Sequence, residues 1–198
     1  DAMDIIANRL SLQSPSTIRD INLAVNQFQS VVSTEGSIEL TDFDGVGETS
    51  VGLRIVHAAA PAGSLKFVSR EGLVVRHAIA GGVNGAVRLS SLTDTVVIER
   101  AASVPVAIES SSIVDVNSPV DILIDGAVVA ADEILYKAAG TVTSPAVGFN
   151  YSVNRAIVFD VGGSLDVKGT LESLDRIELV SHGGQISSSA VIRSEEHT

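Results

Sequence analysis

The sequence predicts an all-β protein and, within that class, a right-handed parallel β-helix, or β-solenoid. The main observation is a repeated phrase: Gly63-Ser-Leu-Lys-Phe-Val-Ser69 returns further along the chain as Gly85-Ala-Val-Arg-Leu-Ser-Ser91. In both copies apolar residues alternate with polar ones, which is the pattern of a half-buried strand. Similar short strands recur roughly every 7 to 12 residues along the chain. A strand phrase that returns at a regular period is typical of proteins built coil upon coil.

A β-helix predicts which residues of this phrase meet in space. Each coil is expected to use about 20–27 residues in two or three short strands, giving roughly nine coils spaced about 4.8 Å apart. Leu65 is then expected beside Val87, and Phe67 beside Leu89, in parallel register inside the protein. An array of β-sandwich modules is the alternative, since it also combines short strands with glycine turns but pairs its strands antiparallel.

The remaining strands are predicted from the same alternation. Val74-Val75 returns as Val96-Val97, which extends the echo. The pattern Gly-[Ser/Ala]-Φ-x-Φ, in which Φ is an aliphatic residue or Phe, begins at residues 36, 63, 85 and 163. Further strands are expected at residues 53–56, 104–108, 113–116, 120–124, 127–130, 156–159 and 176–180.

Two segments leave both helix and strand open. Near the N-terminus, Ile5, Ile6 and Leu10 could share one face of a short helix, whereas residues 9–13 alternate as a strand. Residues 132–139 fit either a helical turn or a strand.

The composition favours a thin aliphatic core and excludes several functions. The 198 residues are 45% hydrophobic but only 4% aromatic, with no Trp and no Cys, so thiol chemistry and disulfides are excluded. The net charge of −11 repels phosphate backbones and argues against nucleic-acid binding. No apolar run reaches the roughly 18 residues of a membrane-spanning helix, so no membrane span is expected.

The two ends of the chain predict that it is an internal piece of a longer protein. Residues 1–192 are expected to form a single β-solenoid segment without capping units, whose open ends could self-associate. Arg193-Ser-Glu-Glu-His-Thr198 resembles the in-frame translation of a sequencing adapter. Residues 193–198 are therefore expected to be a non-native tail that pairs with nothing.

The segment Asp42-Phe-Asp-Gly-Val-Gly-Glu48 is the best candidate for a metal site. Asp42, Asp44 and Glu48 could supply three oxygen ligands to Ca²⁺. The EF-hand pattern fails, however, because Leu40 stands where its first Asp is required. We interpret the segment as an Asp-Gly turn and expect no specific Ca²⁺ site.

Other motifs do not support a cofactor site. Gly45-Val-Gly47 and Gly52 miss the dinucleotide fingerprint, because Ser50 occupies the position of the third glycine. The four histidines show no metal-ligand spacing and are interpreted as isolated residues; they are His57, His77, His182 and His197.

A catalytic function requires a cluster of reactive groups that the sequence does not display. No Gly-x-Ser-x-Gly elbow positions a nucleophile. Paired carboxylates could arise where coils stack, for instance among Asp115, Asp121 and Asp125. With Tyr136 and Tyr151 as the only tyrosines, ring platforms for sugars are scarce. We expect no catalytic residue, no cofactor and no metal.

The Gly-Ser-Φ-x-Φ phrase, the Asp-Gly and Gly-Gly turns and the acidic, cysteine-free composition resemble the repeats of filamentous haemagglutinin-like adhesins and related giant bacterial surface proteins. That resemblance covers roughly residues 5–192 and implies a secreted or cell-surface bacterial rod with structural or adhesive duties. Its partners would be cell-surface or extracellular-matrix components. The alternatives are an array of β-sandwich binding modules and a fragment of a carbohydrate-active β-helix enzyme.

Overall fold

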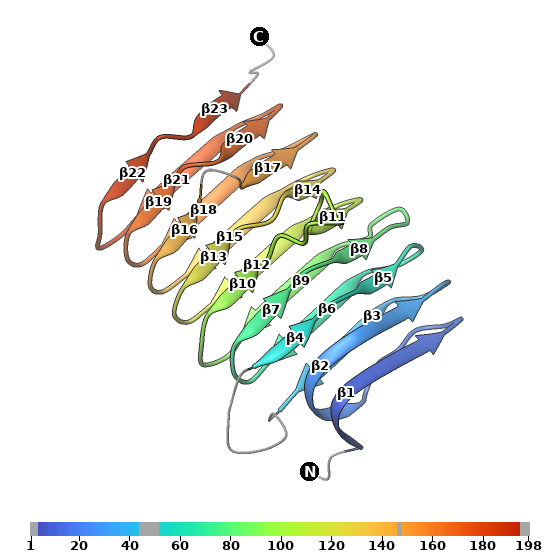
Figure 1. Cartoon of the computed structure of the whole chain (residues 1–198). Coiled ribbons are helices and arrows are strands. Elements are labelled where there is room, and N and C mark those ends of the chain that lie inside the picture. Colours follow the sequence, from blue (N-terminus) through green and yellow to red (C-terminus); the bar gives the residue numbers. More distant parts are fainter. Residues whose placement is uncertain (1–3, 44–51, 146–147, 195–198) are drawn as a thin grey trace.

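Strands and turns make up the whole of the chain that the structure describes. A computed structural model describes residues 4–43, 52–145 and 148–194, and in them 23 strands and no helix occur. Every pairing between named strands is parallel, and the strands stack in about nine turns (Figure 1). The predicted β-solenoid is therefore confirmed. The β-sandwich alternative is wrong, because its strands would pair antiparallel.

From the third strand onward, each turn of the chain adds one strand to each of three faces, which we name A, B and C. Face A consists of β3 (Ile38–Asp42), β6 (Leu65–Ser69), β9 (Val87–Ser91), β12 (Val114–Ser118), β15 (Ile134–Ala138), β18 (Ile157–Val161) and β21 (Ile177–Ser181). Face B consists of β4 (Leu53–Ile55), β7 (Leu73–Val75), β10 (Val96–Ile98), β13 (Ile122–Ile124), β16 (Val142–Ser144), β19 (Leu165–Val167) and β22 (Ile186–Ser188). Face C consists of β5 (Ala58–Ala60), β8 (Ala78–Ala80), β11 (Ile108–Ser110), β14 (Val128–Ala130), β17 (Phe149–Ser152), β20 (Thr170–Ser173) and β23 (Val191–Ser194).

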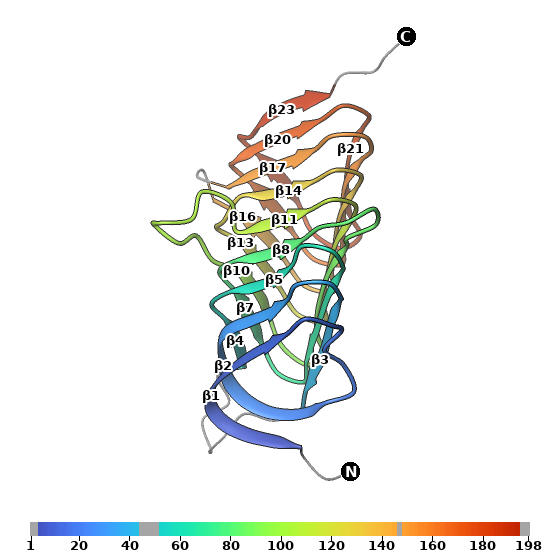
Figure 2. The same ribbon diagram turned by 90° about the vertical axis from the view of Figure 1, so that its right-hand side faces the viewer.

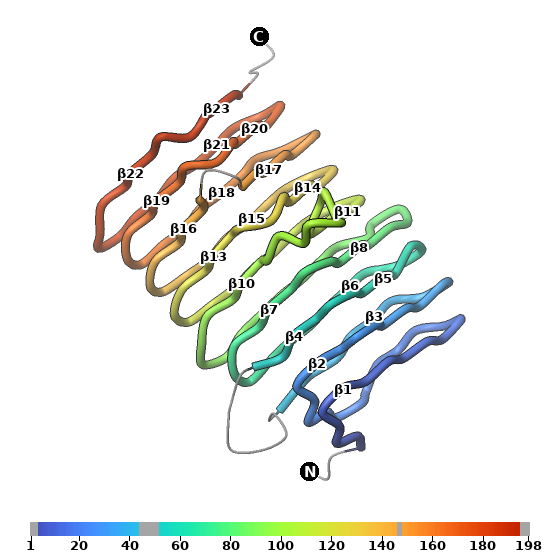
Figure 3. Tube along the Cα trace, in the orientation of Figure 1, coloured from blue at the N-terminus to red at the C-terminus, as the bar shows by residue number. Residues whose placement is uncertain are grey.

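Two longer strands begin the stack. They are β1 (Ile5–Ser14) and β2 (Asn22–Ser33), and β2 runs in succession beside β3, β4 and β5. The trace in Figure 3 follows each turn of the chain as it lies against the next. The N-terminal segment is thus a strand, and so is β15, which settles both segments that the sequence left open.

The core is a narrow column of aliphatic side chains between the three faces. In β6 and β9 the first, third and fifth residues point inward and are buried. Leu65 pairs with Val87, and Phe67 with Leu89, in parallel register, and all four are fully buried. The predicted contacts are confirmed. Similar apolar side chains stack on one another because the inward residues of successive coils occupy equivalent positions.

The coils differ in length because some of them contain insertions. These insertions lie in the turns between strands. The spacing of the face A strands stays within the predicted coil length; these strands begin at Ile38, Leu65, Val87, Val114, Ile134, Ile157 and Ile177. One insertion follows β10, and Figure 2 shows it projecting from the side of the stack. The strand expected at residues 104–108 is wrong for residues 104–107, where Val104 makes only an isolated antiparallel bridge with Ala101, and the strand β11 begins at Ile108.

Two features of the predicted repeat are also wrong in detail. Val96 pairs with Leu73 and Val97 with Val74, so this part of the echo is shifted by one residue. The shift matters because one residue exchanges the inward and outward faces of a strand. The phrase that begins at Gly163 precedes β19 on face B, whereas the copies at 36, 63 and 85 precede face A strands. The Gly-[Ser/Ala]-Φ-x-Φ pattern is therefore typical of a turn that leads into a strand, and it occurs on more than one face.

Serine hydroxyls satisfy the backbone at the corners of the coils. Ser118, the last inward residue of β12, donates from Oγ to the carbonyl of Asp94 at 2.9 Å and accepts from the amide of Val120 at 3.1 Å. Turn carbonyls that are shielded from water need such partners. The same donation to a turn carbonyl is made by Ser33, Ser91, Ser110, Ser152, Ser173, Ser181 and Ser194.

Glycine is required where turns of neighbouring coils touch. A Cβ added at Gly63 would lie 2.5 Å from the carbonyl oxygen of Gly36. That distance is far shorter than a van der Waals contact, so any other residue would push the two coils apart. The glycine of the repeated phrase therefore has a packing role.

The last described coil includes two residues of the segment that was expected to pair with nothing. Ile186, Val191 and Ile192 are about half exposed there, at 48, 51 and 46%. Arg193 and Ser194 belong to β23 and pair with Glu172 and Ser173 of β20. The expectation that residues 193–198 pair with nothing is wrong for these two, because backbone hydrogen bonds along a strand edge do not depend on side-chain identity.

We predict that Leu65→Asp abolishes folding or lowers the free energy of unfolding by at least about 4 kcal/mol, because a buried charge in this core has no partner. Val68→Asp on the outward side of the same strand is the matched control and is expected to cost less than about 1 kcal/mol. Urea unfolding followed by circular dichroism measures both. Equal losses for the two variants would contradict the assigned inward face.

Tyr136 supplies a second prediction, because its hydroxyl is buried and donates to Asn150 Oδ1 at 2.6 Å. Tyr136→Phe leaves that oxygen unpaired and should cost about 1–3 kcal/mol at neutral pH. Burial also raises the pKa of Tyr136 well above 10.0. The folded state then holds the phenol proton more tightly than the unfolded state, so stability should fall as the pH rises above about 10.

The measurement is the urea midpoint of both proteins between neutral pH and the alkaline range. The wild-type protein should lose its advantage over Tyr136→Phe as the pH rises. Parallel curves for the two proteins would show that the phenol proton is not held in this way.

Candidate functional site

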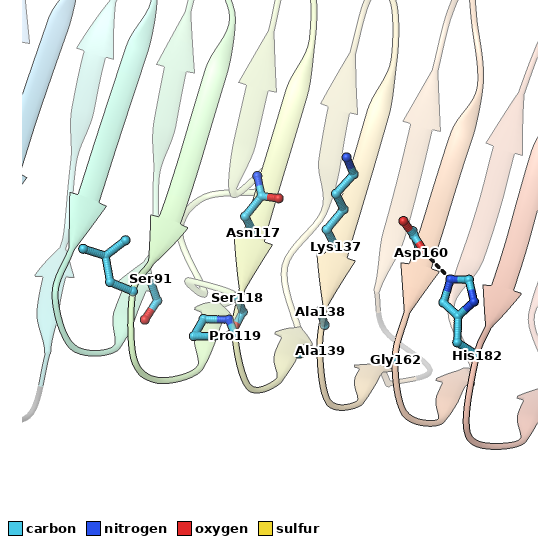
Figure 4. Close-up of a pocket in the computed structure, with 11 residues that line it drawn as sticks. Ser91, Asn117, Ser118, Pro119, Lys137, Ala138, Ala139, Asp160, Gly162 and His182 are labelled. Carbon is cyan, nitrogen blue, oxygen red and sulfur yellow. Dashed lines mark hydrogen bonds and ion pairs between the residues drawn. The ribbon is translucent and has the colours of Figure 1, made fainter.

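A groove crosses the outward side of face A and is the main candidate for a binding surface. Two adjoining clefts of about 480 and 430 Å³ share Lys137, Asp160 and His182 as lining residues. Figure 4 shows Asn117, Lys137, Asp160 and His182 in a row across successive coils. Asn117, Lys137 and Asp160 occupy the same outward position of β12, β15 and β18 and pair in register. We name this surface, together with the other residues that line the two clefts, the face A groove.

The face A groove carries charges of both signs. His182 Nε2 lies 2.7 Å from Asp160 Oδ1, and Arg176 Nε lies 3.5 Å from Glu178 Oε2. Lys137 is exposed and makes no ion pair with any described residue. Small side chains and Pro119 form the other end of the groove, next to Ser91 and Ser118. The groove is thus a long, open track along the stack, lined by polar and apolar side chains together.

A pair of histidines forms a second site, at the corner between faces B and C. His57 precedes β5 and His77 precedes β8, so the two residues lie one coil apart. Their Nδ1 atoms are 2.9 Å apart and their ring centroids 4.9 Å apart, so the rings meet through their Nδ1 edges. One nitrogen donates and the other accepts in such a contact. Burial and the neighbouring His57 lower the pKa of His77, while Glu109 acts in the opposite direction.

The interpretation of these histidines as isolated residues is wrong for His57 and His77. A signal existed in the sequence: Leu53-Arg-Ile-Val-His-Ala-Ala-Ala60 returns one coil later as Leu73-Val-Val-Arg-His-Ala-Ile-Ala80. Stacked coils bring equivalent positions of two copies side by side, and here that position is histidine. His182 instead pairs with Asp160, and His197 lies outside the described residues.

Next to the histidine pair, one carboxylate joins three consecutive coils. Glu99 Oε2 accepts from Arg54 Nη2 at 2.6 Å and from Arg76 Nε at 2.7 Å. Arg54 lies on β4, Arg76 follows β7 and Glu99 follows β10. The arrangement fixes the side chains around this corner. Because the three groups are partly exposed, we assign it to local order more than to stability.

The carboxylates that the sequence suggested as a stacked pair belong to a single coil. Asp115 lies on β12, Asp121 in the turn before β13 and Asp125 in the turn after it. In the ladder Asp115 is paired with Arg88 and Leu135, and it accepts a hydrogen bond from Asn117 at 2.7 Å. Asp121 accepts from the amide of Thr141 at 2.5 Å. The suggested stacking of these carboxylates is wrong, because stacked partners come from different coils.

The possible Ca²⁺ segment is only partly described. Asp42 is buried at the end of β3, and its Oδ1 accepts from the amide of Val25 at 2.9 Å. Asp44 and Glu48 lie outside the described residues, as do Gly45, Gly47 and Ser50, so the absence of a specific Ca²⁺ site stays a prediction. Gly52 has φ +69° and leads into a strand rather than into the helix of a dinucleotide site.

Within residues 4–43, 52–145 and 148–194, no group of three or more His, Asp or Glu side chains could hold a metal ion. No helix of this described part is long and apolar enough to cross a membrane. The two arrangements that could bind a ligand are the face A groove and the pair formed by His57 and His77. Tyr151 adds a partly exposed ring on face C, 6.2 Å from that of Phe149.

Comparison of the chain with protein-family models, with curated proteins and with solved structures finds no match in any of the three. The solenoid architecture is accordingly established by the strand pairing alone.

Proposed function

We propose that this chain is a structural or adhesive rod segment of a large secreted or cell-surface bacterial protein of the filamentous haemagglutinin-like kind, without catalytic activity. The observation that carries the proposal is the continuity of the three ladders. Each coil from β3 to β23 contributes one strand to every face, and each strand pairs with the strand of the same face in the next coil. A body held by backbone hydrogen bonds along its whole length suits a spacer that projects from a surface.

The face A groove supports an adhesive role. Its row of Asn117, Lys137 and Asp160 follows the stack in register, one side chain per coil, and His182 reaches Asp160 from the turn after β21. The groove presents donors and acceptors at the spacing of the coils, about 4.8 Å. An extended, neutral to weakly charged polymer can contact several coils at once. Many weak contacts of this kind add up to firm attachment through multivalency.

An adhesion assay tests this proposal. The protein, immobilised on beads, is expected to bind at least one member of a panel of extracellular-matrix proteins and surface glycans. Asp160→Lys removes the pair with His182 and adds positive charge beside Lys137, and it should weaken that binding by about tenfold or more. Glu172→Lys on the outward side of β20, on face C, is the matched control and should bind like the wild-type protein.

A parallel assay separates adhesion from catalysis. The wild-type protein is incubated with polysaccharides, and the release of reducing ends or unsaturated sugars is followed. Glu133 and Asp160 are carboxylates that line the face A groove. Turnover that is lost in a Glu133→Gln or Asp160→Asn variant would contradict the proposal and favour the carbohydrate-active alternative. Binding that is the same in Asp160→Lys and Glu172→Lys would remove the face A groove from the proposal.

A further inference from the structure

The corner between faces B and C holds two imidazoles whose ring nitrogens are close enough together to become ligands of one metal ion. His57 Nδ1 and His77 Nδ1 point at each other across 2.9 Å, from two consecutive coils. We propose that His57 and His77 form a two-imidazole site for a divalent transition metal such as Zn²⁺, which links the coils of β5 and β8. This site is independent of the face A groove and of the proposed adhesive function.

The distances fit a metal after a small adjustment. Zn–N bonds of about 2.0–2.1 Å at a tetrahedral angle place two ligand nitrogens about 3.3 Å apart. The present separation of 2.9 Å has to grow by only a few tenths of an ångström. The change would require each side chain to rotate, so that both lone pairs aim at one point beside the line that joins the two nitrogens. The metal would take the place of the proton between the two Nδ1 atoms, and the imidazole that donates this proton would carry it on Nε2 instead.

The backbone holds both ligands in place before any metal binds. The carbonyl of His77 accepts from the amide of Ala58 at 2.9 Å, and that of His57 accepts from the amide of Val31 at 3.0 Å. Both histidines are followed directly by strands whose inward residues are buried, Ala58 and Ala78. A pre-organised pair loses less conformational entropy on binding than two mobile side chains would.

The charged side chains around the histidines are of both signs. Burial and His57 lower the pKa of His77, and Glu109 acts against this stronger lowering as a negative charge that raises the pKa. Glu99 accepts from both Arg54 and Arg76 and balances one of their two positive charges. The chain as a whole carries −11. Because two protein ligands leave coordination positions open, water or a donor from another molecule would complete the site.

Imidazole ligands select the class of metal. They suit Zn²⁺, Ni²⁺ and Cu²⁺, whereas Ca²⁺ and Mg²⁺ prefer oxygen ligands. The site is therefore expected to bind Zn²⁺ and Ni²⁺ and to ignore Ca²⁺ and Mg²⁺. Binding to the folded protein alone should also raise its melting temperature.

Titration calorimetry of the full chain with Zn²⁺ tests the proposal. The wild-type protein should show one saturable site, and His57→Ala, His77→Ala and the double variant should each bind Zn²⁺ at least about tenfold more weakly. Zn²⁺ should raise the melting temperature of the wild-type protein but not of the double variant. His182→Ala is the matched control, because it removes a histidine paired with a carboxylate, and it should keep both responses.

Nuclear magnetic resonance identifies the atoms involved. Long-range ¹H–¹⁵N spectra of the wild-type protein should show Zn²⁺ shifting the Nδ1 resonances of both histidines. The proposal is overturned if Zn²⁺ binds the double variant within about twofold of the wild-type affinity. It is equally overturned if no saturable binding occurs, in which case the pair holds a shared proton only. The circular dichroism of each variant shows that its solenoid is intact, since both side chains lie outside the core.

Discussion

The parallel backbone pairing between successive coils is the interaction on which this structure depends. Each strand finds its partner one coil earlier and one coil later, and the rest of the coil serves as the crossover connection that parallel strands need. Pairing in fixed register forces equivalent positions of consecutive coils on top of one another. Inside, this produces stacks such as Leu65 on Val87. The thin core is stable because these aliphatic side chains exclude water along its whole length.

The same register organises the polar groups that a narrow core cannot avoid burying. Turn carbonyls at the corners would be orphaned, and serine hydroxyls such as that of Ser118 bind them. Tyr136 and Asn150 form one polar pair within the core, where the ring of Tyr136 also stacks on Phe159 with centroids 4.9 Å apart. This hydrogen bond offsets the desolvation cost of the phenol and of Asn150 Oδ1, whereas Asn150 Nδ2 is buried without a hydrogen-bond partner.

On the outside, the register converts single residues of separate coils into continuous surfaces. Asn117, Lys137 and Asp160 are each separated by a full coil of the chain, yet they form one row of the face A groove. His57 and His77 meet for the same reason. In a solenoid, functional surfaces therefore run across the coils, and each coil contributes one side chain. A change at one position alters one step of a row and leaves its neighbours in place.

The sequence by itself determined the fold class, the coil length and the inward residues of the clearest strands. Those features depend on local alternation, and the pairs Leu65–Val87 and Phe67–Leu89 follow from it directly. For the other strands, only the tertiary structure decided which residues of neighbouring coils pair, because the register depends on the lengths of all intervening turns. Val97 accordingly pairs with Val74 rather than Val75, and Asp115, Asp121 and Asp125 lie in one coil. The histidine pair was visible as an echo between two similar segments, but only the stacking of β5 on β8 brought its two nitrogens into contact.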